Sequence, residues 1–299
     1  MITVFGSINM DLIASTERLP KPGETVAGTG FSTAAGGKGA NQALAARRAG
    51  ADVRMAGAVG TDTFAEAAVA LLRDAGTDLS AVATVDGPTG TALILVGGDG
   101  ENMIAVVPGA NGEMTAAHAS DAVAVMQASD ILMLQLEIPV AAVEQALASA
   151  RAKGVTTIIN IAPLVPDAAR LGLLADIVIA NETEFERLAG QADMSPEARE
   201  TAMQRIHAET GRTLIVTLGA EGVVAIRDGA FFRSRGLKVE PVDTVGAGDT
   251  FCGYFAASLD RGLAFDAALR RAAAAGSLAC LKAGAQPSIP LSAEVAARL

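Results

Sequence analysis

Short apolar runs alternate with longer amphipathic stretches along most of the chain. The runs have the length and the Val, Ile and Leu content of buried strands, and the stretches between them have helical periodicity. This alternation predicts an α/β fold, with a mostly parallel central sheet and helices on both faces. The predicted strands are Ile2 to Gly6, Val53 to Val59, Ile131 to Leu136, Thr156 to Asn160, Ile177 to Ala180 and Leu214 to Thr217, and the predicted helices include Thr63 to Asp74, Pro139 to Lys153 and Pro196 to Glu209.

Two segments break this alternation and contain no helical pattern. Residues 13–33 alternate in polarity around Pro20, Pro22 and Gly23, and residues 91–108 form two strand-like halves around a Gly-rich turn at 97–102, which is a hairpin signal. We therefore expect one α/β domain over residues 1–299. A small β-sheet, formed by about 12–34 and 90–109, should project from it as a lid.

Composition narrows the functional classes. The formal net charge is −10, so the chain lacks the basic surface of a nucleic-acid-binding protein, and a phosphate site must be built locally. Charges such as Arg270 and Arg271 interrupt the apolar runs, and no signal peptide is evident, so we expect a cytoplasmic protein without membrane attachment. Its two cysteines, Cys252 and Cys280, make neither a disulfide framework nor a zinc site.

The segment Asp243 to Phe251 contains the strongest candidate chemistry. Gly246, Ala247 and Gly248 precede an apolar helical run, and bare amides at a helix start attract anions. Asp249 would repel a phosphate there unless it accepts a proton from an attacking hydroxyl, which suggests phosphoryl transfer to an alcohol. The alternative is an ordinary turn with an acidic residue in the first helical turn. The motif alone does not decide between the two, and it matches neither the dinucleotide nor the Walker A pattern.

A second polar, glycine-rich segment lies at Gly36 to Asn41, before a predicted helix from Gln42 to Arg48. Its glycines leave the backbone bare for a polar ligand, and Asn41 offers both a donor and an acceptor. Lys38 is not a P-loop lysine, because Gly39 occupies the Ser/Thr position. A flexible loop would explain the glycines but not the Lys–Asn pair.

With these motifs in place, the chain resembles the ribokinase branch of the PfkB carbohydrate kinase family nearly end to end. Both glycine-rich motifs occur in the family order and at plausible separation. The matching segments are Gly6 to Asp11, Pro22 to Thr25, Gly36 to Asn41, Asn181 to Glu184, Thr217 to Gly219, Asp243 to Phe251 and Gly284 to Ser288.

The resemblance implies a sugar site on one side of Asp249. Asp11 would accept hydrogen bonds from two neighbouring hydroxyls of a pentose, and Glu137 would be a further sugar-contacting acid, although it could equally be a helix N-terminal charge before Pro139. The implied substrate-binding positions are Asn9, Met10, Asp11, Gly37, Lys38, Gly39, Ala40, Asn41, Glu137 and Asp249.

The resemblance also implies a nucleotide site. Asn181 and Glu184 would help to place Mg²⁺ and the phosphates, partly through water, and the same two residues also fit a helix-capping box. Gly246, Ala247 and Gly248 would form the anion hole and Asp249 would be the catalytic base. The implied nucleotide-binding positions are Asn181, Glu184, Thr217, Leu218, Gly219, Ala220, Glu221, Gly222 and Gly248.

A monovalent activator, K⁺, is implied beside the anion hole, held largely by backbone carbonyls. The matching positions are Asp243, Val245, Ala279, Lys282, Gly284 and Ser288.

The activity implied is ATP-dependent phosphorylation of D-ribose at its 5-hydroxyl, by a homodimer joined through the lid. In such a dimer Ala92, Ile94 and Met103 would face the partner or the substrate, unless they only pack within the sheet. Two alternatives remain: another sugar or nucleoside kinase of the PfkB family, or a sugar-binding regulator without catalysis.

Overall fold

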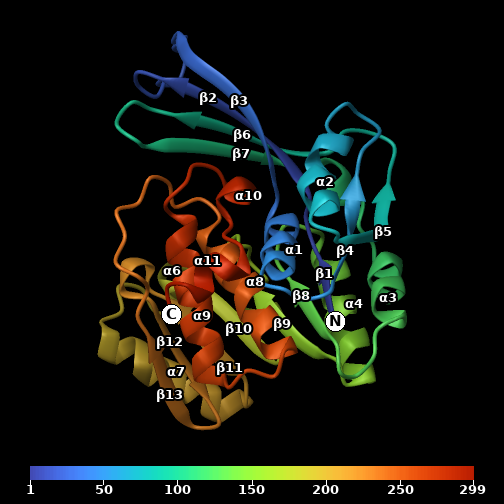
Figure 1. Ribbon diagram of the computed structural model, residues 1–299, viewed down its shortest axis with the longest axis vertical. Coiled ribbons are helices and arrows are strands. Elements are labelled where there is room, and N and C mark those ends of the chain that lie inside the picture. Colours follow the sequence, from blue (N-terminus) through green and yellow to red (C-terminus); the bar gives the residue numbers. More distant parts are fainter.

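Nine strands form the main sheet of the protein, in a computed structural model that describes residues 1–299 (Figure 1). Their order is β13-β12-β11-β10-β9-β8-β1-β4-β5. Neighbouring strands from β11 to β5 are parallel, whereas β12 and β13 are antiparallel to their neighbours. The strands are β1 (Ile2–Phe5), β4 (Val53–Val59), β5 (Asp78–Thr84), β8 (Ile131–Leu134), β9 (Thr156–Asn160), β10 (Ile177–Asn181), β11 (Thr213–Thr217), β12 (Val223–Arg227) and β13 (Ala230–Ser234).

Helices cover both faces of this sheet, as the alternating pattern predicts. Successive strand residues point to opposite faces, so Ile177 and Ile179 join one buried core while Val178 and Ala180 join the other. One core is closed by α1 (Lys38–Arg48), α2 (Ala65–Asp74), α8 (Ala247–Asp260), α9 (Phe265–Ala279) and α11 (Ser292–Ala296). The other is closed by α3 (Ala116–Ala124), α4 (Val140–Lys153), α5 (Ala168–Gly172), α6 (Glu182–Ala189) and α7 (Pro196–Thr210).

A second sheet of four strands projects over the body of the molecule (Figure 1). It contains β2 (Asn9–Thr16), β3 (Gly28–Gly36), β6 (Gly90–Val96) and β7 (Asn102–Val107), in the order β3-β2-β6-β7. The β6–β7 pair is the predicted antiparallel hairpin, whereas β2 and β6 pair in parallel. Because β2 follows β1 closely and β3 leads directly into α1, the base of this lid adjoins the main sheet.

The structure corrects three details of the expected elements. Lys38 to Asn41, predicted as loop, form the first turn of α1, which begins after Gly37 in a left-handed conformation (φ 86°). β5 and the β12–β13 hairpin were not predicted, although Asp228 and Gly229, both with positive φ, are a typical two-residue hairpin turn. The strand predicted at Ile131 to Leu136 ends at Leu134.

Candidate active site

Asp249 lies in the first turn of α8 and is 7% exposed. Gly246 caps the helix in the left-handed region (φ 77°), and the first i to i−4 hydrogen bond runs from Thr250 N to Gly246 O at 2.8 Å. The amides of Gly248 and Asp249 therefore precede the helical ladder and carry the positive end of the helix dipole. The turn has the geometry expected of an anion hole.

The carboxylate of Asp249 is held by two amides from α1. Asn41 Nδ2 donates to Asp249 Oδ2 at 2.9 Å, and Gln42 Nε2 donates to Oδ1 at 3.0 Å. The other amide atom of Asn41, Oδ1, is buried and has no hydrogen-bond partner. A buried acceptor without a partner costs free energy, so this oxygen is suited to receive a hydroxyl of a ligand.

Asp11 lies near both Glu137 and Asp249, and Asn9 begins the same strand, β2, at the base of the lid. Asn9 is buried, and its Oδ1 accepts a hydrogen bond from Asn111 Nδ2 at 2.7 Å. Glu137 Oε2 accepts from Ser7 Oγ at 2.6 Å and from the backbone amide of Lys38 at 3.1 Å. These bonds fix both side chains before any ligand binds.

Strand alternation separates Met10 from its neighbours. Asn9 and Asp11 are two residues apart and share one face of β2, so the Met10 side chain projects from the other face. Of the predicted sugar positions, Met10 is the one whose side chain the strand turns away.

The cluster is dominated by negative charge. Burial, reinforced by Glu137 and Asp249, raises the pKa of Asp11 to about 6. Asp249, followed by Glu137 and Glu184, raises the pKa of Lys38 against the opposing effect of burial. Lys38 is therefore a firmly charged cation among carboxylates, suited to a phosphorylated ligand.

Asn181 and Glu184 form a capping box at the start of α6. Glu184 N donates to Asn181 Oδ1 and Asn181 N donates to Glu184 Oε2, both at 2.8 Å. Burial raises the pKa of Glu184. The box uses one carboxylate oxygen and leaves Oε1 outside it, so the capping and the metal-placing interpretations are compatible.

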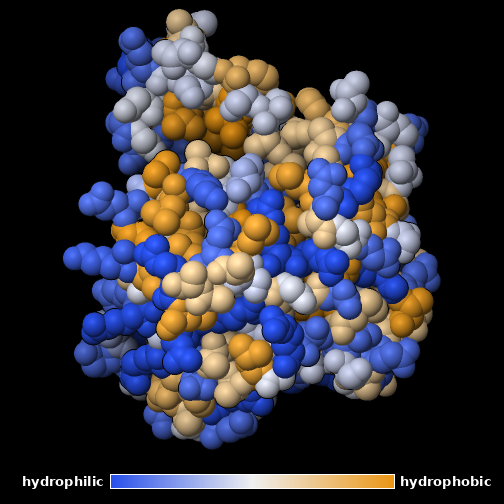
Figure 2. Space-filling model, viewed as in Figure 1, coloured by the Kyte–Doolittle hydropathy of each residue, from blue (hydrophilic) through white to orange (hydrophobic).

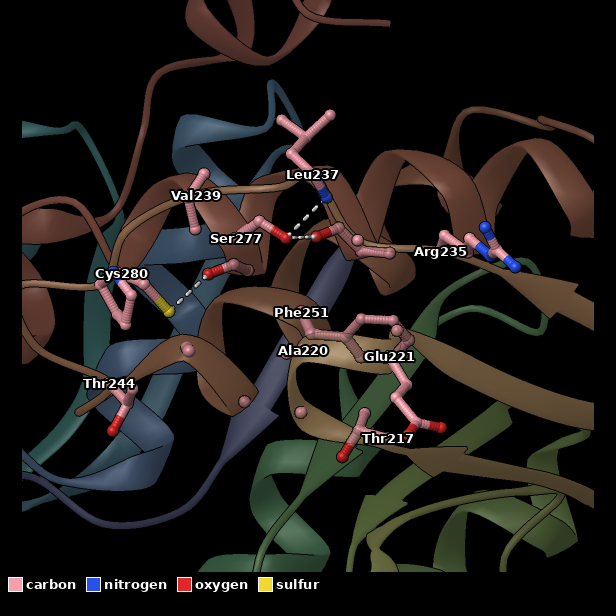
Figure 3. Close-up of a pocket in the computed structure, with 18 of the residues that line it drawn as sticks. Thr217, Ala220, Glu221, Arg235, Leu237, Val239, Thr244, Phe251, Ser277 and Cys280 are labelled. Atoms are coloured by element: carbon pink, nitrogen blue, oxygen red, sulfur yellow. Dashed lines mark hydrogen bonds between the residues drawn. The ribbon is translucent and has the colours of Figure 1, made fainter. Parts of the chain in front are cut away.

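A cavity of about 780 Å³ lies beside the turn that begins α8 (Figure 3). Its lining includes Thr217, Gly219 to Gly222, Ala247 and Gly248, so the predicted nucleotide segment and the predicted anion hole border one space. Its opposite wall comes from 235–239 and from α9, where Ser277 Oγ accepts a hydrogen bond from Leu237 N at 3.0 Å. Leu218 differs from its neighbours, because it packs against the core and lines a separate, smaller cavity.

Asp243 joins the two chain segments predicted to hold a monovalent cation. Its Oδ1 accepts from Val245 N at 3.0 Å and its Oδ2 from Gly284 N at 2.8 Å. Ser288 Oγ donates to Ala285 O and keeps its own lone pairs, whereas the Lys282 ammonium lies 3.6 Å from Glu294. Ala279 is the last residue of α9 and is buried. These oxygen donors suit a hard cation, with Lys282 able to contribute only its backbone.

Sequence reasoning missed several residues that support the site. Ser7 and Asn111 orient Glu137 and Asn9 from positions 130 and 102 residues away along the chain. Gln42, and Gln135, which donates a hydrogen bond to Gln42 Oε1, were also missed. The run of small residues Ala272 to Gly276 was a usable signal for the α9 wall, since Gly276 and Ala273 line the cavity.

The fold and the site together define an α/β phosphotransferase. A model of the pfkB family of carbohydrate kinases matches residues 1–291. A ribokinase of Haemophilus influenzae is 38% identical over 290 residues, covering 97% of this chain and 95% of that protein. A ribokinase of Bacillus subtilis is 37% identical, covering 98% of this chain and 97% of that protein. The solved structure of Arabidopsis thaliana ribokinase complexed with ribose and ATP has a TM-score of 0.87 and 32% identity, over 99% of this chain and 97% of that one.

The chain therefore belongs to the pfkB carbohydrate kinase family. None of its helices has the length and apolar content needed to cross a membrane.

Proposed function

We propose that this protein is a ribokinase, which transfers the γ-phosphoryl group of ATP to the 5-hydroxyl of D-ribose. The observation that supports this most directly is the position of Asp249. It is bonded to Asn41 of the sugar site and sits in the same helical turn as the amides that face the nucleotide cavity. Similarity to the ribokinases of Haemophilus influenzae and Bacillus subtilis supports the choice of sugar.

In the proposed reaction, Asn9, Asp11 and Asn41 bind the ribose hydroxyls. Glu137 and the backbone from Gly37 to Ala40, at the start of α1, line the same site. Asp249 accepts the proton of the 5-hydroxyl as its oxygen attacks the phosphorus in line. Amides of the Gly246 to Gly248 turn donate hydrogen bonds to the transferring group, with that of Ala247 leaving its 3.3 Å bond to Thr244 O, and Lys38 offsets part of the charge.

The residues present also fit the two ions we propose, Mg²⁺ with ATP and K⁺ as activator. Magnesium keeps several of its waters and is bound largely through substrate phosphates, so one amide and one carboxylate that reach it indirectly suit it. Asn181 and Glu184 would reach its water shell, and Mg²⁺ would supply neutralisation of phosphate charge. Asp243 and Ser288 would hold K⁺ with backbone carbonyls of Val245, Ala279, Lys282 and Gly284.

A coupled assay of ADP release tests this function. We expect ribose to be the best substrate among ribose, deoxyribose, fructose and nucleosides, with turnover higher in K⁺ than in Na⁺. A strong preference for fructose or a nucleoside would identify a different kinase of the family. Ribose binding without ADP release would identify a sugar-binding regulator.

Sugar affinity should depend on pH through Asp11. Its pKa of about 6 means that the carboxylate, which accepts hydrogen bonds from ribose, exists above pH 6 and is lost below it. We expect ribose binding, measured by calorimetry without ATP, to be about tenfold weaker at pH 5 than on the plateau above pH 7. Asp11→Asn should bind weakly at every pH and lack this step. Constant wild-type affinity from pH 5 to pH 8 would contradict the role of Asp11.

We also propose a homodimer formed through the lid, in the cytoplasm, where ATP is available. The lid is a single layer with apolar side chains on both faces, and Figure 2 shows apolar residues gathered on it. Ile104 and Val106, on the face that Asp11 shares, are 54% and 51% exposed. The opposite face exposes Phe31, Leu93, Met103 and Val107. An exposed apolar surface of this kind favours contact with a second subunit. Ala92, in contrast, is buried within the protein and does not contribute to this surface.

A further inference from the structure

Two buried glutamines form a chain that ends on the carboxylate of Asp249. Gln135, which follows β8, is 0% exposed, and Gln42 of α1 is 1% exposed. Gln135 Nε2 donates to Gln42 Oε1 at 2.6 Å, and Gln42 Nε2 donates to Asp249 Oδ1 at 3.0 Å. Gln42 Nε2 also donates to Asn160 Oδ1 at 3.3 Å. Neither glutamine lines the nucleotide cavity.

The partners of Gln42 allow only one orientation of its amide. Its two N–H bonds meet two acceptor oxygens, those of Asp249 and Asn160, and its oxygen meets the NH₂ group of Gln135. If the amide were turned over, its oxygen would face two acceptors and its NH₂ group would face a donor. The carboxylate of Asp249, which can only accept, therefore fixes the orientation of Gln42, and Gln135 supplies the donor that the Gln42 oxygen then needs.

This pair is poorly explained as a contribution to stability. Gln135 Oε1 is buried without a hydrogen-bond partner, and Gly6 makes room for it, since a Cβ there would lie within van der Waals overlap of that oxygen. Two apolar side chains would remove this unpaired oxygen, but they would also leave Asp249 Oδ1 without the donor that it has in Gln42. The polar pair thus has a use other than packing.

We propose that Gln42 and Gln135 are positioning residues that fix the rotation of the Asp249 carboxylate for proton abstraction. Asn41 holds the other oxygen but also has an unpaired atom for the sugar, whereas Gln42 donates both of its amide hydrogens within the protein, to Asp249 and to Asn160. A carboxylate oxygen has two lone pairs, so each oxygen of Asp249 keeps one for the attacking hydroxyl after accepting an amide hydrogen. Fixing both oxygens aims those lone pairs, and this inference rests on the proposed kinase function.

The test removes the amides but keeps the side-chain length. Gln42→Met and Gln135→Met are compared with Gln145→Met, a control that breaks a glutamine hydrogen bond to Ser149 within α4, away from the site. Ribose binding by calorimetry gives the number of competent sites, so that kcat is expressed per binding site. We expect kcat to fall about 10- to 100-fold in Gln42→Met and roughly tenfold in Gln135→Met, with KM for ribose within about twofold and the control unchanged.

The split between kcat and KM separates positioning from loss of structure, because a damaged sugar site would change KM for ribose as well. Gln42→Glu keeps the shape of the side chain but replaces the amide donor with a carboxylate, which cannot donate to Asp249 Oδ1. We therefore expect Gln42→Glu to lower kcat at least as far as Gln42→Met does.

Unchanged kcat per site in both Met variants, or a loss confined to KM for ribose, would overturn the positioning role. If Asp249→Asn also left turnover intact, the role of Asp249 as base would fail, and if the wild-type protein released no ADP with ribose, the proposed function itself would fail. If Asp249→Asn lost turnover while both Met variants kept it, only the role of the glutamine chain would fail.

Discussion

Asp249→Asn is expected to lower kcat by about 10²- to 10⁴-fold or more while the protein folds and still binds ribose. The amide cannot accept the proton of the attacking hydroxyl. In addition, it would present its NH₂ group to one of the two amide donors that now bond the carboxylate, Asn41 Nδ2 or Gln42 Nε2. Turnover is measured by coupled assay and ribose binding by calorimetry on the same preparation.

The matched control for this variant is Asp266→Asn. Asp266 is likewise an acid in the first turn of a helix, α9, but it is exposed and remote from the anion hole. Its substitution should leave kcat within about twofold of the wild type. Near-normal turnover in Asp249→Asn would remove Asp249 from the mechanism.

Gly246→Ala is expected to lower kcat by roughly 10²-fold through displacement of the anion hole. The residue has φ of 77°, and an added Cβ would lie 2.9 Å from both Cα and Cβ of Ala285. That neighbour is mostly backbone and cannot yield, so the start of α8 must move, and the amides and Asp249 move with it.

Gly262→Ala is the control that separates the backbone strain of a positive φ from displacement of the helix start. Gly262 has nearly the same φ, 74°, beyond the other end of α8, and a Cβ there would meet nothing within 4 Å. It should cost stability on the order of 1 kcal/mol, seen as a lower Tm, with kcat retained. If Gly246→Ala kept kcat within threefold of Gly262→Ala, the anion hole would not depend on this turn.

The main sheet could be predicted from sequence because its strands are short apolar runs, buried on both faces. The strand at Val53–Val59 matches its prediction at both ends, and that at Ile131–Leu134 is two residues shorter than predicted. The start of α1 could not be predicted in the same way. Glycines at 36, 37 and 39 indicate a loop locally, but close packing requires them: a Cβ on Gly39 would lie 2.6 Å from Ser7 N.

The predicted site was a set of motifs, and the structure adds the contacts between them. The turn at 246–249 had a local signal because its chemistry lies within four consecutive residues. Gln42 and Gln135 are 93 residues apart, and nothing in either local pattern indicates that they meet. The wall at 235–239 was missed for a similar reason, since contacts distant in sequence place it, such as the hydrogen bond from Leu237 N to Ser277 Oγ of α9.

The most direct test is a crystal structure of the wild-type protein with ribose and a non-hydrolysable ATP analogue. The measurement is the distance from the ribose O5 atom to the nearer carboxylate oxygen of Asp249. We predict a hydrogen bond of about 2.6 to 3.2 Å, with the γ-phosphate against the amides of Gly246 to Gly248. An O5 atom farther from Asp249 than a single bridging water can span would contradict the account.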